Sequence, residues 1–407
     1  MTIRKLLFFV FSFCPLTMMA QDADKGVELA DHALTLLLHH QTDSLYSMMA
    51  ESVKAQLPRE QLEGGMSQIE QVAGVYQRHG TWEHQQQNAS ELYTSVIDFQ
   101  NGQLSFVVGF DADWRIHTIR IMPLPSEQAS DDMPLVDDAV EVNDTVRTGT
   151  DISLPCSIVI SGRSATPPMV VLVHGSGATD RNETVVANRP FLDLSRQLAE
   201  HGISSLRYDK RTFVYPEIVS SMDDETINDA MSAVKLARSY TDGPVFLLGH
   251  SLGAMLAPII ASRIKLEGII MMAAPARDLT EILDEQLNYL SPTDATTDQK
   301  QAVIDQMRYQ SPHYLQPQHQ VEAAQHLSVP MLFLQGGRDY QVLMKDFLLW
   351  KKALAGKANV QFVDYPSLNH LFLYGEGKST PQEYATKGII PSEVVNDIAQ
   401  FINRYLK

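Results

Sequence analysis

Cysteine, basic residues and long apolar runs are all scarce in this chain of 407 residues. It has two cysteines, Cys14 and Cys156, and 32 Lys and Arg against 49 Asp and Glu, for a net charge of −17. Proteins that bind nucleic acid neutralise its phosphates with a basic stripe, and none is visible, so no nucleic-acid partner is expected. No segment offers the ~20 uncharged apolar residues of a membrane-spanning helix, so stable membrane insertion is not expected. The remaining composition, 44% hydrophobic and 20% charged, is ordinary for a soluble globular protein.

The first 20 residues have the layout of a secretory signal peptide. Arg4 and Lys5 form a basic start, Leu6–Phe13 forms an apolar core, and Ala20 suits the position before a cleavage site. The alternative, a first core helix, is disfavoured by an internal proline and by the lack of a polar face. After cleavage only Cys156 remains, which excludes an internal disulfide and a thiolate metal site. We therefore expect an exported protein, periplasmic or secreted, whose core is large enough to need no disulfide.

Residues 25–122 predict a small α+β domain. Apolar residues recur at three- and four-residue spacing between residues 25 and 75, which is typical of helices. Strand-like runs follow at Leu92–Phe99, Leu104–Phe110 and Trp114–Ile121, and Asn101-Gly102 is a hairpin signal between the first two. This order of elements resembles the DUF3887 domain, a cone-shaped fold related to NTF2. A set of polar and aromatic residues either lines a small-molecule pocket or is partly buried structure: His79, Trp82, His84 and Tyr93.

The second half of the chain predicts an α/β domain over residues 139–407, after a linker over residues 123–138. Pro, Ser and acidic residues without periodicity indicate the linker. Short apolar strands that alternate with helices indicate a mostly parallel sheet covered on both faces. The expected strands are Val140–Val146, Ile152–Ile160, Met169–Val173, Ile203–Arg207, Val245–Leu248, Gly268–Met272, Met331–Leu334 and Val360–Val363. The expected helices are Phe191–Glu200, Glu225–Tyr240, Ala254–Ile264, Phe347–Leu354 and Val394–Tyr405.

A G-x-S-x-G pattern, Gly249-His250-Ser251-Leu252-Gly253, stands between an expected strand and an expected helix. A nucleophilic serine needs a tight strand-to-helix turn in a strained conformation, so that its Oγ points into open space. Glycines two residues away on either side let neighbouring backbone approach this turn. The following helix directs its N–H groups and a partial positive charge at the reacting centre. Ser251 is therefore the predicted nucleophile; the alternative is a bystander serine in a glycine-rich turn.

A serine hydroxyl needs a base, and the base needs an orienting carboxylate. Asp339 follows the expected strand Met331–Leu334, and His370 follows the last expected strand. The carboxyl ends of parallel strands form the edge where ligands bind, so both residues are predicted members of a catalytic triad with Ser251. The chain order Ser, Asp, His agrees with this assignment.

Other residues compete for these roles. Asp364 also ends a strand but lies only six residues before His370. His250 should point away from the nucleophile, and His313 lies in the expected lid. His174 is expected to make structural hydrogen bonds.

An oxyanion hole is expected at His174-Gly175-Ser176-Gly177, directly after the strand Met169–Val173. The developing oxyanion needs two backbone donors. The N–H of Leu252, next to the nucleophile, is the first candidate, and the N–H of Ser176 is the second.

Residues 140–407 resemble an α/β-hydrolase. The matching stretches are HGSGATDRNET (174–184), RYDKRT (207–212), GHSLG (249–253), QGGRDYQV (335–342) and LNHLF around His370. Behind a DUF3887-like domain, this combination is similar to the EstD-type bacterial carboxylesterases. The resemblance implies Ser251, Asp339 and His370 as the triad and esterase activity on short acyl chains. The first two stretches also carry charges that either form a network near the site or are solvated: Asp180, Arg181, Glu183, Arg207, Asp209, Lys210 and Arg211.

An insertion at about residues 276–327 interrupts the sheet, with helical patterns at Asp278–Leu290 and Gln299–Tyr309. Its place after the strand Gly268–Met272 suits a lid over the serine. Candidate lining residues, each alternatively mere packing, are Tyr289, Met307, Tyr314 and Tyr340.

The predicted function is serine carboxylester hydrolysis, which requires no metal and no cofactor, with a small-molecule ester as partner. A peptidase or amidase shares the same triad and is the first alternative. The second alternative is a periplasmic binding protein with a vestigial hydrolase domain, against which the intact Ser, Asp and His argue.

Overall fold

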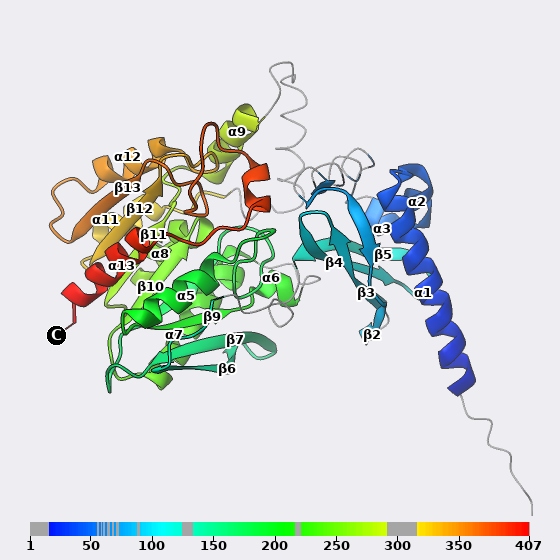
Figure 1. The fold of residues 1–407 in the computed structure, drawn as a ribbon, viewed down its shortest axis with the longest axis horizontal. Helices are drawn as coiled ribbons and strands as arrows, with labels where there is room; N and C mark the ends of the chain where they lie inside the picture. The colour runs from blue at the N-terminus through cyan, green and yellow to red at the C-terminus, as the bar shows by residue number, and fades with distance from the viewer. Residues whose placement is uncertain are drawn as a thin grey trace, which may run out of the picture. The chain divides into compact units, whose positions relative to one another are not determined.

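The computed structural model (Figure 1) describes residues 16–54, 73–87, 90–123, 133–215, 221–290 and 316–406, with scattered residues between 57 and 70. The chain forms two compact units. The first comprises Met1–Glu70, Val75–Phe99 and Leu104–Ile121, and the second comprises Gln71–Gly74, Gln100–Gln103 and Met122–Lys407. Most of the predicted signal segment lies outside the described residues, so export stays a prediction. Within the ranges given above, no helix combines the length and the apolar character needed to cross a membrane.

The first unit, blue to cyan in Figure 1, sets helices against an antiparallel sheet. Its labelled helices are α1 (Leu16–Leu38), α2 (Thr42–Met48) and α3 (Glu51–Lys54). Its strands are β1 (Tyr76–His79), β2 (Glu83–Gln87), β3 (Ser90–Phe99), β4 (Gly102–Phe110) and β5 (Ile116–Pro123). The strand order is β1-β3-β4-β5, with β2 paired to β3. A small α+β domain is what the periodicity predicted.

Two strands of this unit carry no apolar signal. β1 reads YQRH and β2 reads EHQQQ, and both pair with the amphipathic strand β3. The candidate pocket residues lie around them and contact other rings: the rings of His84 and Tyr93 stack at 4.8 Å, and Trp82 lies 5.6 Å from His79. Tyr93 is completely buried, which supports a structural role for this residue, whereas His84 is exposed.

The second unit, green to red in Figure 1, is a mostly parallel sheet between helices. Its strands are β6 (Ala139–Thr148), β7 (Ile152–Ser161), β8 (Met169–Val173), β9 (Ser204–Tyr208), β10 (Val245–His250), β11 (Gly268–Met272), β12 (Met331–Gly336) and β13 (Val360–Tyr365). Its helices are α5 (Pro190–Glu200), α6 (Arg211–Val214), η2 (Asp223–Asn228), α7 (Asp229–Tyr240), α8 (Leu252–Arg263), α9 (Leu279–Leu290), α11 (Gln320–His326), α12 (Met344–Ala353), η4 (Pro381–Ala385) and α13 (Ser392–Arg404).

The order of the sheet is β13-β12-β11-β10-β8-β9-β7-β6. All neighbours from β13 to β9 are parallel, while β7 pairs antiparallel with both β9 and β6. The strand β10, which carries the G-x-S-x-G pattern, lies between β8 and β11, so its carboxyl end is at the middle of the sheet edge.

Both faces of this sheet are buried, as the continuous apolar strands predicted. In β8, Val171 and Val173 face a core that includes residues of α7, α8 and α12. Val170 and Leu172 face the opposite core, which includes residues of α5 and α13. Each such side chain contributes ~1.5–3 kcal/mol when buried, so the sheet positions its edge residues rigidly.

Several local predictions differ from the structure. The helix expected from Glu225 to Tyr240 begins with the π-helical segment η2 and continues as α7. The helix expected from Ala254 begins two residues earlier, at Leu252. The short helices α6 and α11 were not anticipated, and the expected lid helix Gln299–Tyr309 lies outside the described residues.

Candidate active site

Ser251 stands at the sharp turn between β10 and α8. Its φ is 51° and its ψ is −113°, a region that residues other than glycine rarely adopt. Its N–H donates to the carbonyl of Met272 at the end of β11 (2.9 Å), which holds the turn against the sheet. Strain of this kind persists only where the surroundings impose it, and it is frequent at functional sites.

The glycines of the pattern are required by close backbone approach. A Cβ on Gly253 would lie 2.2 Å from the carbonyl oxygen of Val173, and one on Gly249 would lie 2.3 Å from the backbone of Gly253. No side chain fits at either distance. The two glycines therefore let α8 begin directly beneath the turn that carries Ser251.

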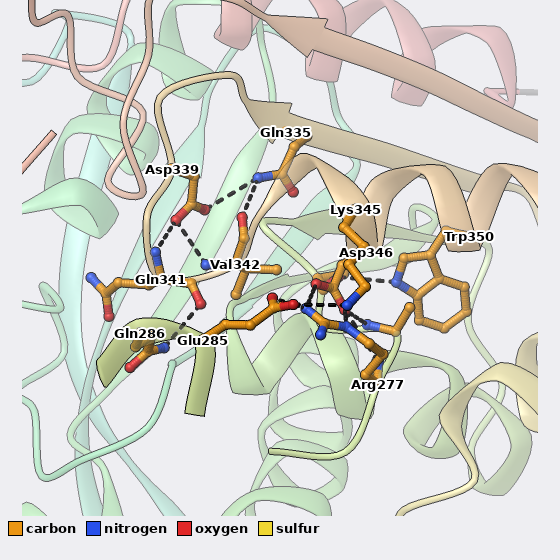
Figure 2. Close-up of polar contacts among 12 residues, drawn as sticks. Arg277, Glu285, Gln286, Gln335, Asp339, Gln341, Val342, Lys345, Asp346 and Trp350 are labelled. Carbon is orange, nitrogen blue, oxygen red and sulfur yellow. Dashed lines mark hydrogen bonds and ion pairs between the residues drawn. The ribbon is translucent and has the colours of Figure 1, made fainter. Parts of the chain in front are cut away.

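Asp339 lies in the loop after β12 and is fully engaged by hydrogen bonds (Figure 2). Its Oδ1 accepts the N–H groups of Gln341 (2.8 Å) and Val342 (2.9 Å). Its Oδ2 accepts Nε2 of Gln335 (3.2 Å) and faces Nδ1 of His370 at 2.7 Å. The side chain of Asp339 is fully buried, so these groups hold the carboxylate in one orientation.

His370 lies in the loop after β13, and Asn369 shapes that loop. Oδ1 of Asn369 accepts the N–H groups of Leu371 (3.0 Å) and Leu373 (3.1 Å). The contact with Asp339 fixes the tautomer, because a nitrogen that faces a carboxylate must carry the proton. In the neutral ring, Nε2 of His370 is then the nitrogen without a proton, which is the tautomer that a general base requires.

The competing residues lie elsewhere or have other partners. Asp364 is exposed on β13, and His313 lies outside the described residues. Nε2 of His174 donates to the carbonyl of Asp180 (3.0 Å), and burial lowers the pKa of His174 to about 4, so the ring is neutral. Both ring nitrogens of His250 face other residues: Nδ1 lies 3.0 Å from Glu183 Oε2, and Nε2 lies 2.9 Å from the carbonyl of His370.

The predicted oxyanion turn lies directly beside the nucleophile. A Cβ on Gly175 would lie 3.2 Å from the Cβ of Ser251. The N–H of Gly175 donates to Oε1 of Glu183 (2.7 Å), and its carbonyl accepts Nζ of Lys210 (2.8 Å). Leu252 is the first residue of α8, so its N–H belongs to the helix end that carries a partial positive charge.

The charged residues of the two matching stretches are buried, and most of them form ion pairs, which rules out a solvated loop. Arg181 binds Asp209 at 2.8 Å, and Lys210 binds Glu225 at 2.8 Å, with at most 10% of any of these side chains exposed. Arg211 and Arg207 bind Asp229 and Glu141 respectively. The partners Glu225, Asp229 and Glu141 escaped the sequence reasoning because they lie on other elements, without a local pattern that marks them.

The described start of the insertion is anchored near Asp339 (Figure 2). Nε2 of Gln286, on α9, donates to the carbonyl of Gln341 (2.9 Å). Arg277 binds the buried Asp346 of α12 (2.7 Å). Tyr289 stacks on Tyr340 with ring centroids 5.5 Å apart, while the predicted lining residues Met307 and Tyr314 lie outside the described residues, as do residues 291–315 of the expected lid.

Metal ligands and a reactive thiol are two further features considered in the described part of the chain. It contains no group of three or more His, Cys, Asp or Glu side chains arranged to hold a metal ion. Cys156 is buried, and burial raises the pKa of its thiol to about 12, so it is not a reactive thiolate.

Comparison with known proteins gives consistent matches for both units. A model of the alpha/beta hydrolase family matches residues 170–386, and that of DUF3887, a protein family of unknown function, matches residues 30–118. The protein named Esterase EstD from Thermotoga maritima is 33% identical over 395 residues, which cover 91% of this chain and 95% of that protein. The structure of an esterase from Pyrococcus furiosus superposes with a TM-score of 0.50 over 69% of this chain and 95% of that chain. At 15% identity, this last likeness concerns the fold alone. The chain belongs to the alpha/beta hydrolase family and carries a DUF3887 domain at its amino-terminal end.

Proposed function

We propose that this protein is a serine carboxylesterase that hydrolyses esters of short acyl chains through an acyl-enzyme. The name of the Thermotoga relative, Esterase EstD, supports the ester as substrate, since 33% identity extends over 91% of the chain. The similarity of the sequence to EstD-type enzymes favours short acyl groups.

In this mechanism Ser251 Oγ attacks the ester carbonyl while Nε2 of His370 takes its proton. The N–H groups of Ser176 and Leu252 stabilise the oxyanion. The imidazolium of His370 then protonates the leaving alcohol, and the acyl group stays on Ser251. Water, deprotonated by His370, attacks the acyl-enzyme and releases the acid. Asp339 holds the ring of His370 in the correct tautomer throughout.

The observation that carries the proposal is the buried pair of Asp339 and His370. Their contact of 2.7 Å joins the loops after β12 and β13. His250, directly before the nucleophile, lies with its ring centroid 4.7 Å from that of His370. An acid and base so oriented, together with a serine on a strained turn, are the groups needed to activate a hydroxyl.

The test is hydrolysis of p-nitrophenyl acetate and butyrate by wild type and Ser251→Ala. We expect the wild type to turn over both esters at a rate that EDTA does not change. In Ser251→Ala we expect kcat to fall by ~10⁵-fold or more. The thermal midpoint should change little, because the variant removes one hydroxyl and keeps the backbone. Activity that depends on a metal, or that survives in Ser251→Ala, would contradict the mechanism. A matching p-nitroanilide measures the amidase alternative in the same assay.

We also propose that the protein is exported and that residues 1–20 are removed. The basic start, apolar core and Ala20 support this. Mass spectrometry of the protein from a periplasmic fraction should give an amino terminus near residue 21; an intact terminus in the cytoplasm would contradict it.

A further inference from the structure

Behind the proposed triad lies a second histidine–carboxylate pair that the mechanism above does not use. Nδ1 of His250 lies 3.0 Å from Oε2 of Glu183, and only 6% and 5% of the two side chains are exposed. Burying an ion pair costs desolvation free energy, so its presence at a site calls for a further role.

The contacts of His250 determine its protonation. Its Nε2 lies 2.9 Å from the carbonyl of His370, which only accepts, so Nε2 carries a proton. Its Nδ1 lies 3.0 Å from the carboxylate of Glu183, whose negative charge favours a proton there as well. The surroundings of His250 therefore favour the imidazolium. Burial acts to lower the pKa of His250, but the charge of Glu183 and the hydrogen bond to the carbonyl of His370 raise it above the ordinary value.

The remaining titratable groups around the pair agree with this charge state. Asp339 also favours the cation on His250. Burial acts to raise the pKa of Glu183, but the charge of His250 lowers it below its usual range. The ring of His370, whose centroid lies 4.7 Å from that of His250, is the nearest group that has to accept a proton during the reaction.

The other end of the pair holds the oxyanion turn. Oε1 of Glu183 accepts the N–H of Gly175 at 2.7 Å, and Lys210 binds the carbonyl of the same residue at 2.8 Å. Since a peptide unit is planar and trans, fixing the carbonyl of Gly175 also fixes the direction of the following N–H. That N–H belongs to Ser176, a proposed oxyanion donor.

We propose that Glu183 and His250 are positioning residues, which tie the oxyanion turn at Gly175 to the backbone of the base loop at His370. Oε1 of Glu183 accepts the N–H of Gly175 in the oxyanion turn, and Oε2 contacts Nδ1 of His250. Nε2 of His250 in turn contacts the carbonyl of His370 in the base loop. The imidazolium also opposes protonation of the neighbouring base in the free enzyme. This inference rests on the proposed esterase mechanism.

Glu183→Ala and Glu183→Gln separate positioning from other roles. Glutamine keeps an oxygen that can accept the N–H of Gly175. Its amide NH₂ can donate to Nδ1 of His250 in the neutral form. The Nε2–H of that neutral ring still donates to the carbonyl of His370. Alanine removes both contacts, the one with the N–H of Gly175 and the one with His250. We expect Glu183→Ala to lower kcat ~10²-fold with KM nearly unchanged, since loss of one oxyanion donor costs ~10²–10³-fold. Glu183→Gln should restore kcat to within ~10-fold of wild type.

His250→Gln gives an independent measurement. It removes the cation beside the base and leaves the carboxylate of Glu183. The acid limb of the kcat/KM profile, which reports protonation of the base in the free enzyme, should therefore move to higher pH by ~1 unit. Asp229→Asn is the matched control, because its side chain is also fully buried and paired, with Arg211. We expect this control to lower the thermal midpoint but to leave kcat and the acid limb unchanged.

Three results would overturn the inference: a normal kcat or a change in KM alone in Glu183→Ala, no rescue by glutamine, or an unmoved acid limb in His250→Gln. The same kcat loss in Asp229→Asn would also overturn it, because the effect would then be general destabilisation. If Glu183→Ala fails to fold, the kcat of Glu183→Gln and the pH profile of His250→Gln still test the positioning role of the pair. Wild type and Ser251→Ala in the same assay test the proposed function itself: an inactive wild type defeats the mechanism, whereas an active wild type with unaffected Glu183 variants defeats only the positioning role.

Discussion

Asp339→Asn tests how the base is held. The Oδ1 of Asp339 accepts the N–H groups of Gln341 and Val342 at 2.8 and 2.9 Å, and its Oδ2 faces Nδ1 of His370 at 2.7 Å. Asparagine keeps one oxygen for the two N–H groups, so the loop should keep its conformation. Its NH₂ group then faces His370, whose Nδ1 has to accept. The proton moves to Nε2, which is the atom that must receive the proton of Ser251.

The magnitude follows from these contacts. The wrong tautomer and the loss of the carboxylate beside the imidazolium should lower kcat by ~10³–10⁴-fold. That corresponds to ~4–5.5 kcal/mol of transition-state stabilisation. A second cost falls on stability, because Nε2 of Gln335 donates to the same Oδ2 at 3.2 Å. In the variant two amide donors face each other, and a buried donor without a partner costs ~1–3 kcal/mol of unfolding free energy.

The assay is kcat and KM for p-nitrophenyl butyrate, together with urea denaturation. Asp364→Asn is the matched control, since Asp364 is the exposed carboxylate on β13 that the sequence left as the alternative acid. We expect no change in that variant. The reasoning is refuted if Asp339→Asn keeps more than ~10% of wild-type kcat, or if the loss appears in Asp364→Asn instead.

Two further predictions concern buried charges. Burial raises the pKa of Asp193 to about 6, so its contribution to stability is fully present below the ordinary pKa of ~4 and is lost as the pH rises through 6. Asp193→Asn should therefore raise the unfolding free energy by ~1–3 kcal/mol at about pH 7.5 but not near pH 4, in thermal melts across that range; a difference independent of pH would contradict this. Arg277→Met leaves the fully buried carboxylate of Asp346 without its cation and should cost ~3–5 kcal/mol in urea denaturation. Adding Asp346→Asn should recover part of that loss, and two losses that simply add would show that the pair does not interact.

The architecture of the second unit could be predicted from the sequence because its strands are buried on both faces. Continuous apolar runs such as Met169–Val173 and Gly268–Met272 appear in the structure with the predicted bounds. The positions of Ser251, Asp339 and His370 could be proposed for the same reason, since residues after parallel strands gather at one edge of the sheet. The polar strands β1 and β2 could not be predicted from the sequence, because they contribute little apolar surface of their own and form by pairing with the amphipathic strand β3.

The sequence by itself determined the alternation of strands and helices, the strained turn at Ser251 and the candidates for acid and base. These signals are local, because each depends on neighbouring residues and on the period of the backbone. Only the tertiary structure decided that Asp339 rather than Asp364 lies beside His370, and that Glu183, His250 and Lys210 hold the backbone around the site. Most of those contacts join residues far apart in the chain, and the sequence does not show that a charge is buried until its partner is known.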